Sequence, residues 1–269
     1  MNKQVKIFII ALLMALLQAC GGNDESTAKV DTSSPDGAML SAINALKNND
    51  IKALMQASMS KTDYDKSVAE FEKAKTSPSE SDKAQFAQMM GMLTADGAED
   101  QLMAMATPQL EQMRAQLPML LMMGKGMASQ AIESSAEIPT EQKETVTKTA
   151  NALMDFVSNN DILSEEVTRK AISAAVNTAK SLDMKSLDQL QNMSFDDAMG
   201  KASLVMGGVK DVLNVYGISL DDVLSSVKIS DVDNQGETAV MKVAYDFLGQ
   251  SFTQNVKMHK KDGQWLSDK

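Results

Sequence analysis

Residues 239–247 read Ala-Val-Met-Lys-Val-Ala-Tyr-Asp-Phe, and this stretch decides the fold class. Every second position is apolar, and this period of two predicts a β-strand with one buried face. The apolar positions are Ala239, Met241, Val243, Tyr245 and Phe247. Turn sequences flank the stretch at Asn234-Gln235-Gly236 and Gly249-Gln250. The stretch is therefore expected to be the centre of an antiparallel sheet.

The chain after this strand repeats the same kind of signal. Phe252, Val256 and Met258 mark a second strand, Lys261-Asp262-Gly263 a turn, and 264–266 a short closing strand. Residues 227–269 are therefore expected to form a β-meander of three to four strands. Helices should cover the face that carries Met241, and Trp265 should pack on that layer.

From Pro35 to Gly217 the apolar residues instead recur every three or four positions, which indicates helices. Ser34-Pro35 is a capping residue followed by proline at the first helical position. Other helix starts are predicted at Thr140, Ser164, Ser186, Ser194 and Ser219, and Gly217 is a plausible helix end. The fold class expected is α+β, mostly α: a helical body over 35–226 and the sheet after it.

The N-terminus carries a targeting signal. Lys3 and Lys6 precede an apolar run of eleven residues from Ile7 to Leu17. That length suits a signal peptide and is well short of the roughly 20 residues that span a bilayer. Residues 1–19 are therefore expected to be a signal peptide.

The end of this run, Leu17-Gln18-Ala19-Cys20, resembles the lipobox of bacterial lipoproteins, with Gln18 less usual than Ser or Thr at its position. The resemblance implies cleavage between Ala19 and Cys20, a diacylglycerol thioether on Cys20, and usually acylation (palmitate) of the new amino group. The alternative is an ordinary secretory signal that happens to end in a cysteine. In Gram-negative bacteria, an Asp directly after the lipidated Cys favours retention at the inner membrane. Gly21 stands at this position instead, so the resemblance implies the outer membrane.

The polar residues 21–34 follow the cysteine and carry no apolar period, so a flexible tether is expected there. The protein would then be lipid-anchored to the outer membrane, facing the periplasm, with the membrane as its first partner.

A second resemblance covers only the two ends of the body. Residues 42–51, Ala-Ile-Asn-Ala-Leu-Lys-Asn-Asn-Asp-Ile, and the ending Lys261-Asp262-Gly263-Gln264-Trp265 are similar to small envelope lipoproteins of the nuclear-transport-factor-2-like, cystatin-like type. The similarity spans roughly 36–60 and 227–269 and implies helices packed in a curved antiparallel sheet. Residues 78–217 are then a candidate insertion. That superfamily includes both enzymes and non-catalytic binders, so the resemblance implies no activity.

Composition excludes several classes of function. The net charge of −10 argues against nucleic acid as a partner, and a single Cys excludes disulfide frameworks and thiolate zinc sites. The single imidazole, His259, is expected to face solvent on its strand. Asp231–Gly236 is similar to the start of a calcium-binding loop. The pattern fails at position five, which is Gln235, and at position twelve, where Lys242 replaces the required Glu. We therefore predict that the protein is not an enzyme and that it has no catalytic residue, cofactor or metal.

Methionine is the unusual residue: the chain has 22, and ten of them lie between positions 89 and 127. Three interpretations are open: core packing, an adaptable apolar groove for a lipid, peptide or partner helix, or a Cu(I) site at Met119, Met122 and Met123. Because these three and Leu120 surround their helix instead of forming one ligand face, the cluster is expected to be mostly interior or to line an apolar groove, and not to bind copper. Its members are Met89, Met90, Met92, Met103, Met105, Met113, Met119, Met122, Met123 and Met127.

The function expected from the sequence is a lipid-anchored envelope protein that acts as a non-catalytic binding or structural module. The alternative is a carrier of a small apolar ligand or peptide in a Met-rich helical groove, with Cu(I) handling less favoured. A protein partner is also compatible with this composition.

Overall fold

The computed structural model describes residues 30–73, 79–136 and 138–268. The helices are α2 (Pro35–Lys47), α3 (Ile51–Ser58), α4 (Lys61–Lys73), α5 (Glu80–Thr94), α6 (Ala98–Ser134), α7 (Thr140–Asn159), α8 (Glu165–Leu182), the 3₁₀ helix η1 (Leu187–Asn192), α9 (Phe195–Val215) and α10 (Leu220–Ser225). The strands are β1 (Lys228–Asn234), β2 (Thr238–Phe247), β3 (Gln250–Lys261) and β4 (Gln264–Ser267). The predicted fold class is confirmed: a mostly helical chain ends in a four-stranded antiparallel sheet.

The sheet is a plain meander in the order β1-β2-β3-β4. Two of its turns use consecutive residues with positive φ, Leu248-Gly249 and Asp262-Gly263, as tight hairpins require. The first of these turns lies one residue earlier than predicted, because Gln250 already pairs with Phe247 as part of β3. Asp231–Gly236 belongs to β1 and its hairpin turn, and Lys242 pairs with Asp231 at 2.6 Å.

The core lies between this sheet and α2. Met241 and Val243 of β2 are fully buried in one cluster with Ile43 of α2. Trp265 of β4, only 2% exposed, belongs to the same cluster. The predicted buried face and the predicted position of the tryptophan are both confirmed.

Serine caps begin most of the later helices where the sequence predicts them. Ser164, Ser194 and Ser219 each accept a backbone hydrogen bond in the first turn, which satisfies an otherwise unpaired amide. Ser186 forms a full capping box with Gln189, although the helix that follows is the 3₁₀ helix η1. α7 differs by one residue: Pro139 is its N-cap and Thr140 its first residue.

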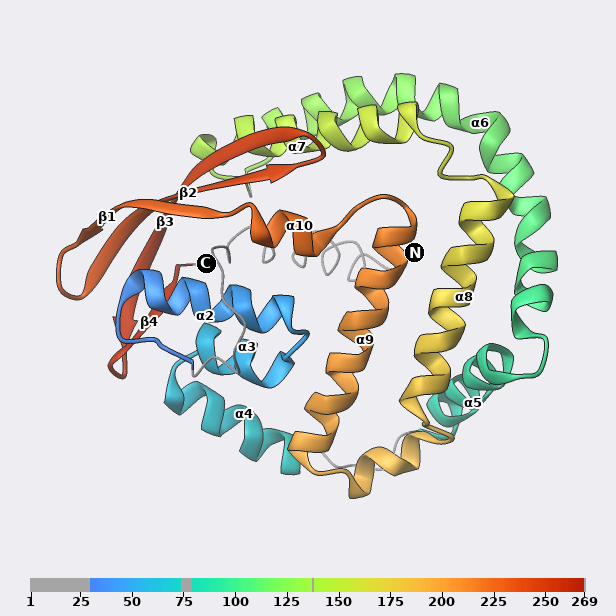
Figure 1. Cartoon of the computed structure of the whole chain (residues 1–269), viewed down its shortest axis with the longest axis horizontal. Coiled ribbons are helices and arrows are strands. Elements are labelled where there is room, and N and C mark those ends of the chain that lie inside the picture. Colours follow the sequence, from blue (N-terminus) through green and yellow to red (C-terminus); the bar gives the residue numbers. More distant parts are fainter. Residues whose placement is uncertain (1–29, 74–78, 137, 269) are drawn as a thin grey trace.

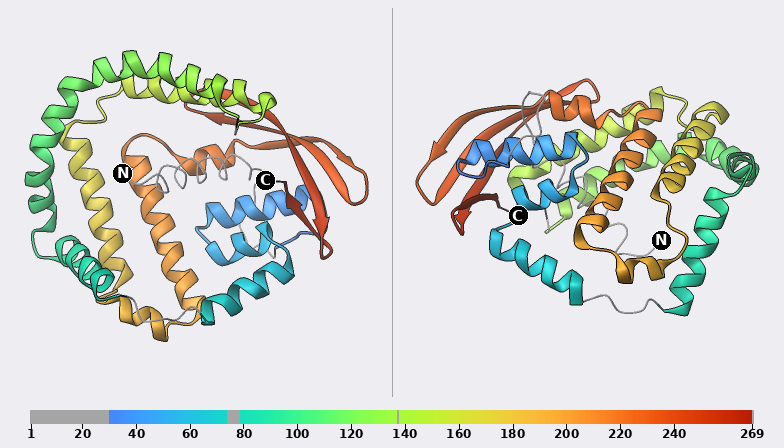
Figure 2. Two further views of the ribbon diagram at one scale, coloured as in Figure 1. Left: turned by 180° about the vertical axis from the view of Figure 1, so that it is seen from behind. Right: turned by 60° about the horizontal axis from the view of Figure 1, so that its bottom comes forward.

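The helices between the two ends of the chain lie in layers outward from the core. α9 packs on α3, α8 on α9, and α6 on both α8 and α7. Figures 1 and 2 show α6 curving around the edge of the molecule, with its outer side convex. Two prolines, Pro108 and Pro118, lie inside this helix, and proline is the common cause of such bends. The assignment of 78–217 as an insertion stays a prediction.

The end of the predicted tether is held against the fold. The Thr32 carbonyl accepts a hydrogen bond from Trp265 N at 3.1 Å, and Asp31 N donates to Ser41 Oγ at 2.8 Å. The stretch that can act as a tether therefore ends near Asp31 instead of Ser34. Ala19 and Cys20, the predicted cleavage and lipidation residues, lie outside the described residues.

Candidate functional site

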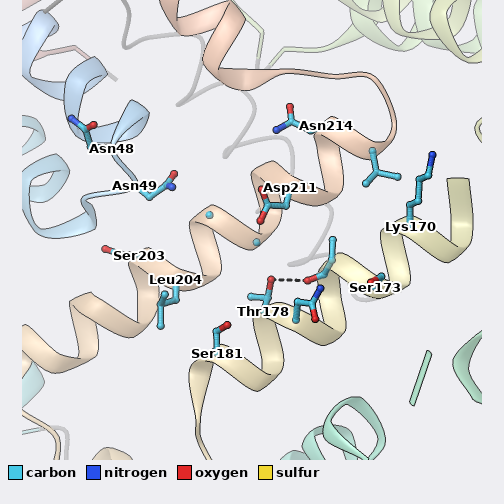
Figure 3. A pocket seen from close by; sticks show the side chains of 15 residues that line it. Asn48, Asn49, Lys170, Ser173, Thr178, Ser181, Ser203, Leu204, Asp211 and Asn214 are labelled. Atoms are coloured by element: carbon cyan, nitrogen blue, oxygen red, sulfur yellow. Dashed lines mark hydrogen bonds between the residues drawn. The ribbon is translucent and has the colours of Figure 1, made fainter. Parts of the chain in front are cut away.

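A groove of about 900 Å³ lies between α8 and α9. The turn after α2 closes one end of it. Figure 3 shows Asn48 and Asn49 on that turn facing the two helices. Three different segments of the chain therefore build the groove.

A close helix crossing shapes the groove. A Cβ atom placed on Gly208 of α9 would lie 2.1 Å from Thr178 Oγ1 of α8, so only glycine allows the two helices to approach this far. The neighbouring Gly207 leaves room for Asn49, whose Nδ2 would lie 3.3 Å from an added Cβ. The Gly207-Gly208 pair is the sequence signal of this crossing, since glycine inside a helix otherwise costs stability.

The lining of the groove is neutral and rich in hydrogen-bonding groups. Its polar residues are Asn48, Asn49, Lys170, Ser173, Asn177, Thr178, Ser181, Ser203, Asp211 and Asn214. Some of these groups are already used: Lys170 pairs with Glu166 at 2.7 Å, and Ser173 donates to Glu99 at 2.9 Å. The amide side chains can each donate and accept, which suits a ligand made of peptide or hydroxyl groups.

Asn49 is the most constrained of these amides. Its backbone is left-handed, with φ 55°, a conformation that asparagine tolerates better than most residues. Its Oδ1 is buried and lacks a hydrogen-bond partner within the described part of the molecule. A buried carbonyl oxygen in this state costs about 1–3 kcal/mol.

Few titratable groups lie in the described lining of the groove. Asp211 is the one carboxylate in its described lining, and neither a histidine nor a cysteine lies there. His259 lies on β3 with a side chain that is 43% exposed, and its Nδ1 is 2.5 Å from Asp268 Oδ1. The buried Lys210 caps the end of α2 through the carbonyls of Leu46 and Lys47 and pairs with Asp221 at 2.6 Å. These titratable groups are thus engaged in structural contacts.

The methionine cluster is placed differently from the sequence prediction. Met90 and Met103 are buried, but Met122 is 81% exposed, and six others of the cluster are at least half exposed. The prediction of a mostly interior cluster is therefore wrong. A depression of about 410 Å³ between α6 and α7 contains one of these methionines, Met122, beside Leu117 and Leu121.

No protein-family model, curated protein or solved structure matches this chain significantly. Within the described ranges, no helix is long and apolar enough to cross a membrane. In the same part of the chain, no group of three acidic, histidine or cysteine side chains could hold a metal ion.

Proposed function

We propose that this chain is a lipid-anchored protein of the bacterial outer membrane, facing the periplasm, that acts as a non-catalytic binding module. One observation carries the proposal: the single cysteine of the chain, Cys20, directly follows an eleven-residue apolar run and the small residue Ala19. A diacylglyceryl group with a further acyl chain anchors a protein firmly, whereas one chain alone binds only marginally.

The groove between α8 and α9 supports the binding role. Its amide and hydroxyl lining favours a neutral, polar ligand, and we expect an extended peptide, because each asparagine can pair with a peptide N–H and C=O.

The anchor is tested by changing Cys20→Ala in cells that are fed labelled palmitate. The unchanged chain should mature with the mass expected for cleavage after Ala19 and incorporate the label. The variant should remain uncut and unlabelled. Normal maturation and labelling of the variant would reject the lipid anchor.

The groove is tested by native mass spectrometry of the mature protein purified from its own membrane. We expect a bound species in addition to the lipid, and we expect the double variant Asn177→Leu, Asn214→Leu to lose it. Asn159→Leu, at an exposed asparagine on α7 away from the groove, is the matched control. Equal retention in all three proteins would reject the groove as the binding site.

A further inference from the structure

The outer face of α6 is apolar and exposed. On a helical wheel at 100° per residue, Met105, Met113 and the five residues named next fall within an arc of about 180°, half of the helix circumference. All of them are at least half exposed: Met119, Leu120, Met122, Met123 and Met127. The polar residues between them on this face are glutamines 109, 112 and 116. We call this surface the α6 methionine face.

The basic residues of the same segment point elsewhere, and the exposed Glu111 lies at the edge of the face, about 20° beyond Met122 on the wheel. Arg114 donates to the Leu163 carbonyl at 2.6 Å, and Lys125 pairs with Asp155 of α7 at 2.5 Å. Both lie opposite the methionine face on the wheel. The inner side of α6 is apolar as well, with Met103 and Ile132 buried. A helix that is apolar on both sides needs a second apolar surface against its outer side.

We propose that the α6 methionine face lies on the surface of the lipid bilayer, as a second attachment beside the lipid on Cys20. This inference rests on the proposed function, because the lipid anchor brings the bilayer to the protein. Between Cys20 and Thr32, where the chain is held to β4, twelve residues reach at most about 40 Å. That reach is comparable with the diameter of a domain of this size, so the anchor allows any face to approach the bilayer.

Charge selects this face among those that the tether allows. The chain carries a net charge of −10, so most of its surface is repelled by anionic headgroups. The α6 methionine face has a charged residue, Glu111, only at its edge and can enter the interface without losing an ion pair. Interfacial helices bind in proportion to the apolar area that they bury, and tethering removes most of the entropic cost of association.

A second copy of the chain fits this face less well. The outer side of α6 is convex, so two such helices related by a twofold axis touch along only part of their length (Figure 1). The half of α6 from Pro118 to Ser134 is about 25 Å long and 10 Å wide, or about 250 Å². A stable protein complex buries about 800 Å² on each partner, roughly three times as much.

The test uses a fluorescent label on α6 in the mature protein. Because lipid occupies Cys20, Met122→Cys introduces the one free thiol, which takes an environment-sensitive dye. In vesicles of phosphatidylethanolamine and phosphatidylglycerol, we expect blue-shifted emission and loss of intensity with a quencher carried on the lipid chains. Met127→Cys, on the same face, should behave alike. Val232→Cys on β1, also exposed, is the control and should keep water-like, unquenched emission.

The outcomes separate the docking from the anchor. Equal quenching at positions 122 and 232 would overturn the docking. A blue shift that grows with the density of protein on the vesicles, without quenching by the lipid-borne quencher, would overturn the docking on the bilayer. It would indicate that a second copy of the chain covers the α6 methionine face. Intact mass reports the lipid on Cys20 independently, and a chain without lipid can be mixed with the same vesicles. Quenching at position 122 in mature protein whose intact mass shows no lipid on Cys20 would reject the proposed anchor and keep the docking.

Discussion

The molecule uses methionine in two regions for opposite purposes. At the sheet, Met39, Met241 and Met258 are at most 3% exposed and fill the core beside Trp265. On α6, Met122 is 81% exposed, beside the depression between α6 and α7. The comparison shows that a methionine-rich segment reveals little until the opposite side of its helix is known. Because Met103 and Ile132 are already buried on the inner side of α6, most of its remaining methionines are exposed.

The largest effect is expected in the core. Trp265→Ala removes the largest fully buried side chain that we find at the sheet, and should lower the free energy of unfolding by about 3–5 kcal/mol. Urea denaturation followed by circular dichroism measures this loss. A loss below about 1 kcal/mol would mean that the sheet end is not the stable region.

A smaller effect is expected where α8 crosses α9, between the two regions. Gly208→Ala places a methyl group 2.1 Å from Thr178 Oγ1 and should cost about 1–3 kcal/mol by forcing the helices apart. Gly200→Ala on the same helix has open space around it and should stabilise the protein by up to about 1 kcal/mol. Comparing the two urea midpoints checks the crossing, and equal shifts would contradict it.

The contact between α4 and the sheet should depend on pH. The hydrogen bond from Lys261 lowers the pKa of Asp63, and Ser60 lowers it further. Because the pKa is lower in the folded state, this contact stabilises the fold above the ordinary Asp range near 4, and the stabilisation is lost as pH falls through the folded-state pKa.

Lys261→Met should therefore destabilise the protein at pH 7 and have less effect at pH 3, where Asp63 is increasingly protonated. Urea midpoints at the two pH values measure this difference. Lys257→Met, at an exposed lysine of the same strand, is the control and should show no such trend. A Lys261→Met effect that is independent of pH would show that the ion pair is not the cause.

The smallest effect on stability is expected on α6. Met122→Gln should change the free energy of unfolding by less than about 0.5 kcal/mol, because its side chain is mostly in water. The same change at Met241 should cost several times more, since it places an amide in the core. Similar losses at both positions would remove the distinction between the two regions.

The sequence predicted the parts of this fold whose signal is local. The period of two around Met241 and the serine caps at Ser164 and Ser194 each follow from neighbouring residues. The groove could not be predicted in this way, because Asn49 and Asn177 come from segments more than a hundred positions apart. The outward face of α6 was also missed, since a helix that is apolar on both sides does not show which side is packed.

Methionine oxidation tests the contrast between the two regions most directly. A lipid-free chain that begins at residue 21 keeps every described residue and can be treated with dilute peroxide, then analysed by peptide mass spectrometry. We predict that Met122, Met123 and Met127 oxidise as fast as the exposed Met89 of α5, while Met39, Met241 and Met258 react only as the protein unfolds. Protection of the α6 methionines to the level of Met241 in this chain would contradict the account.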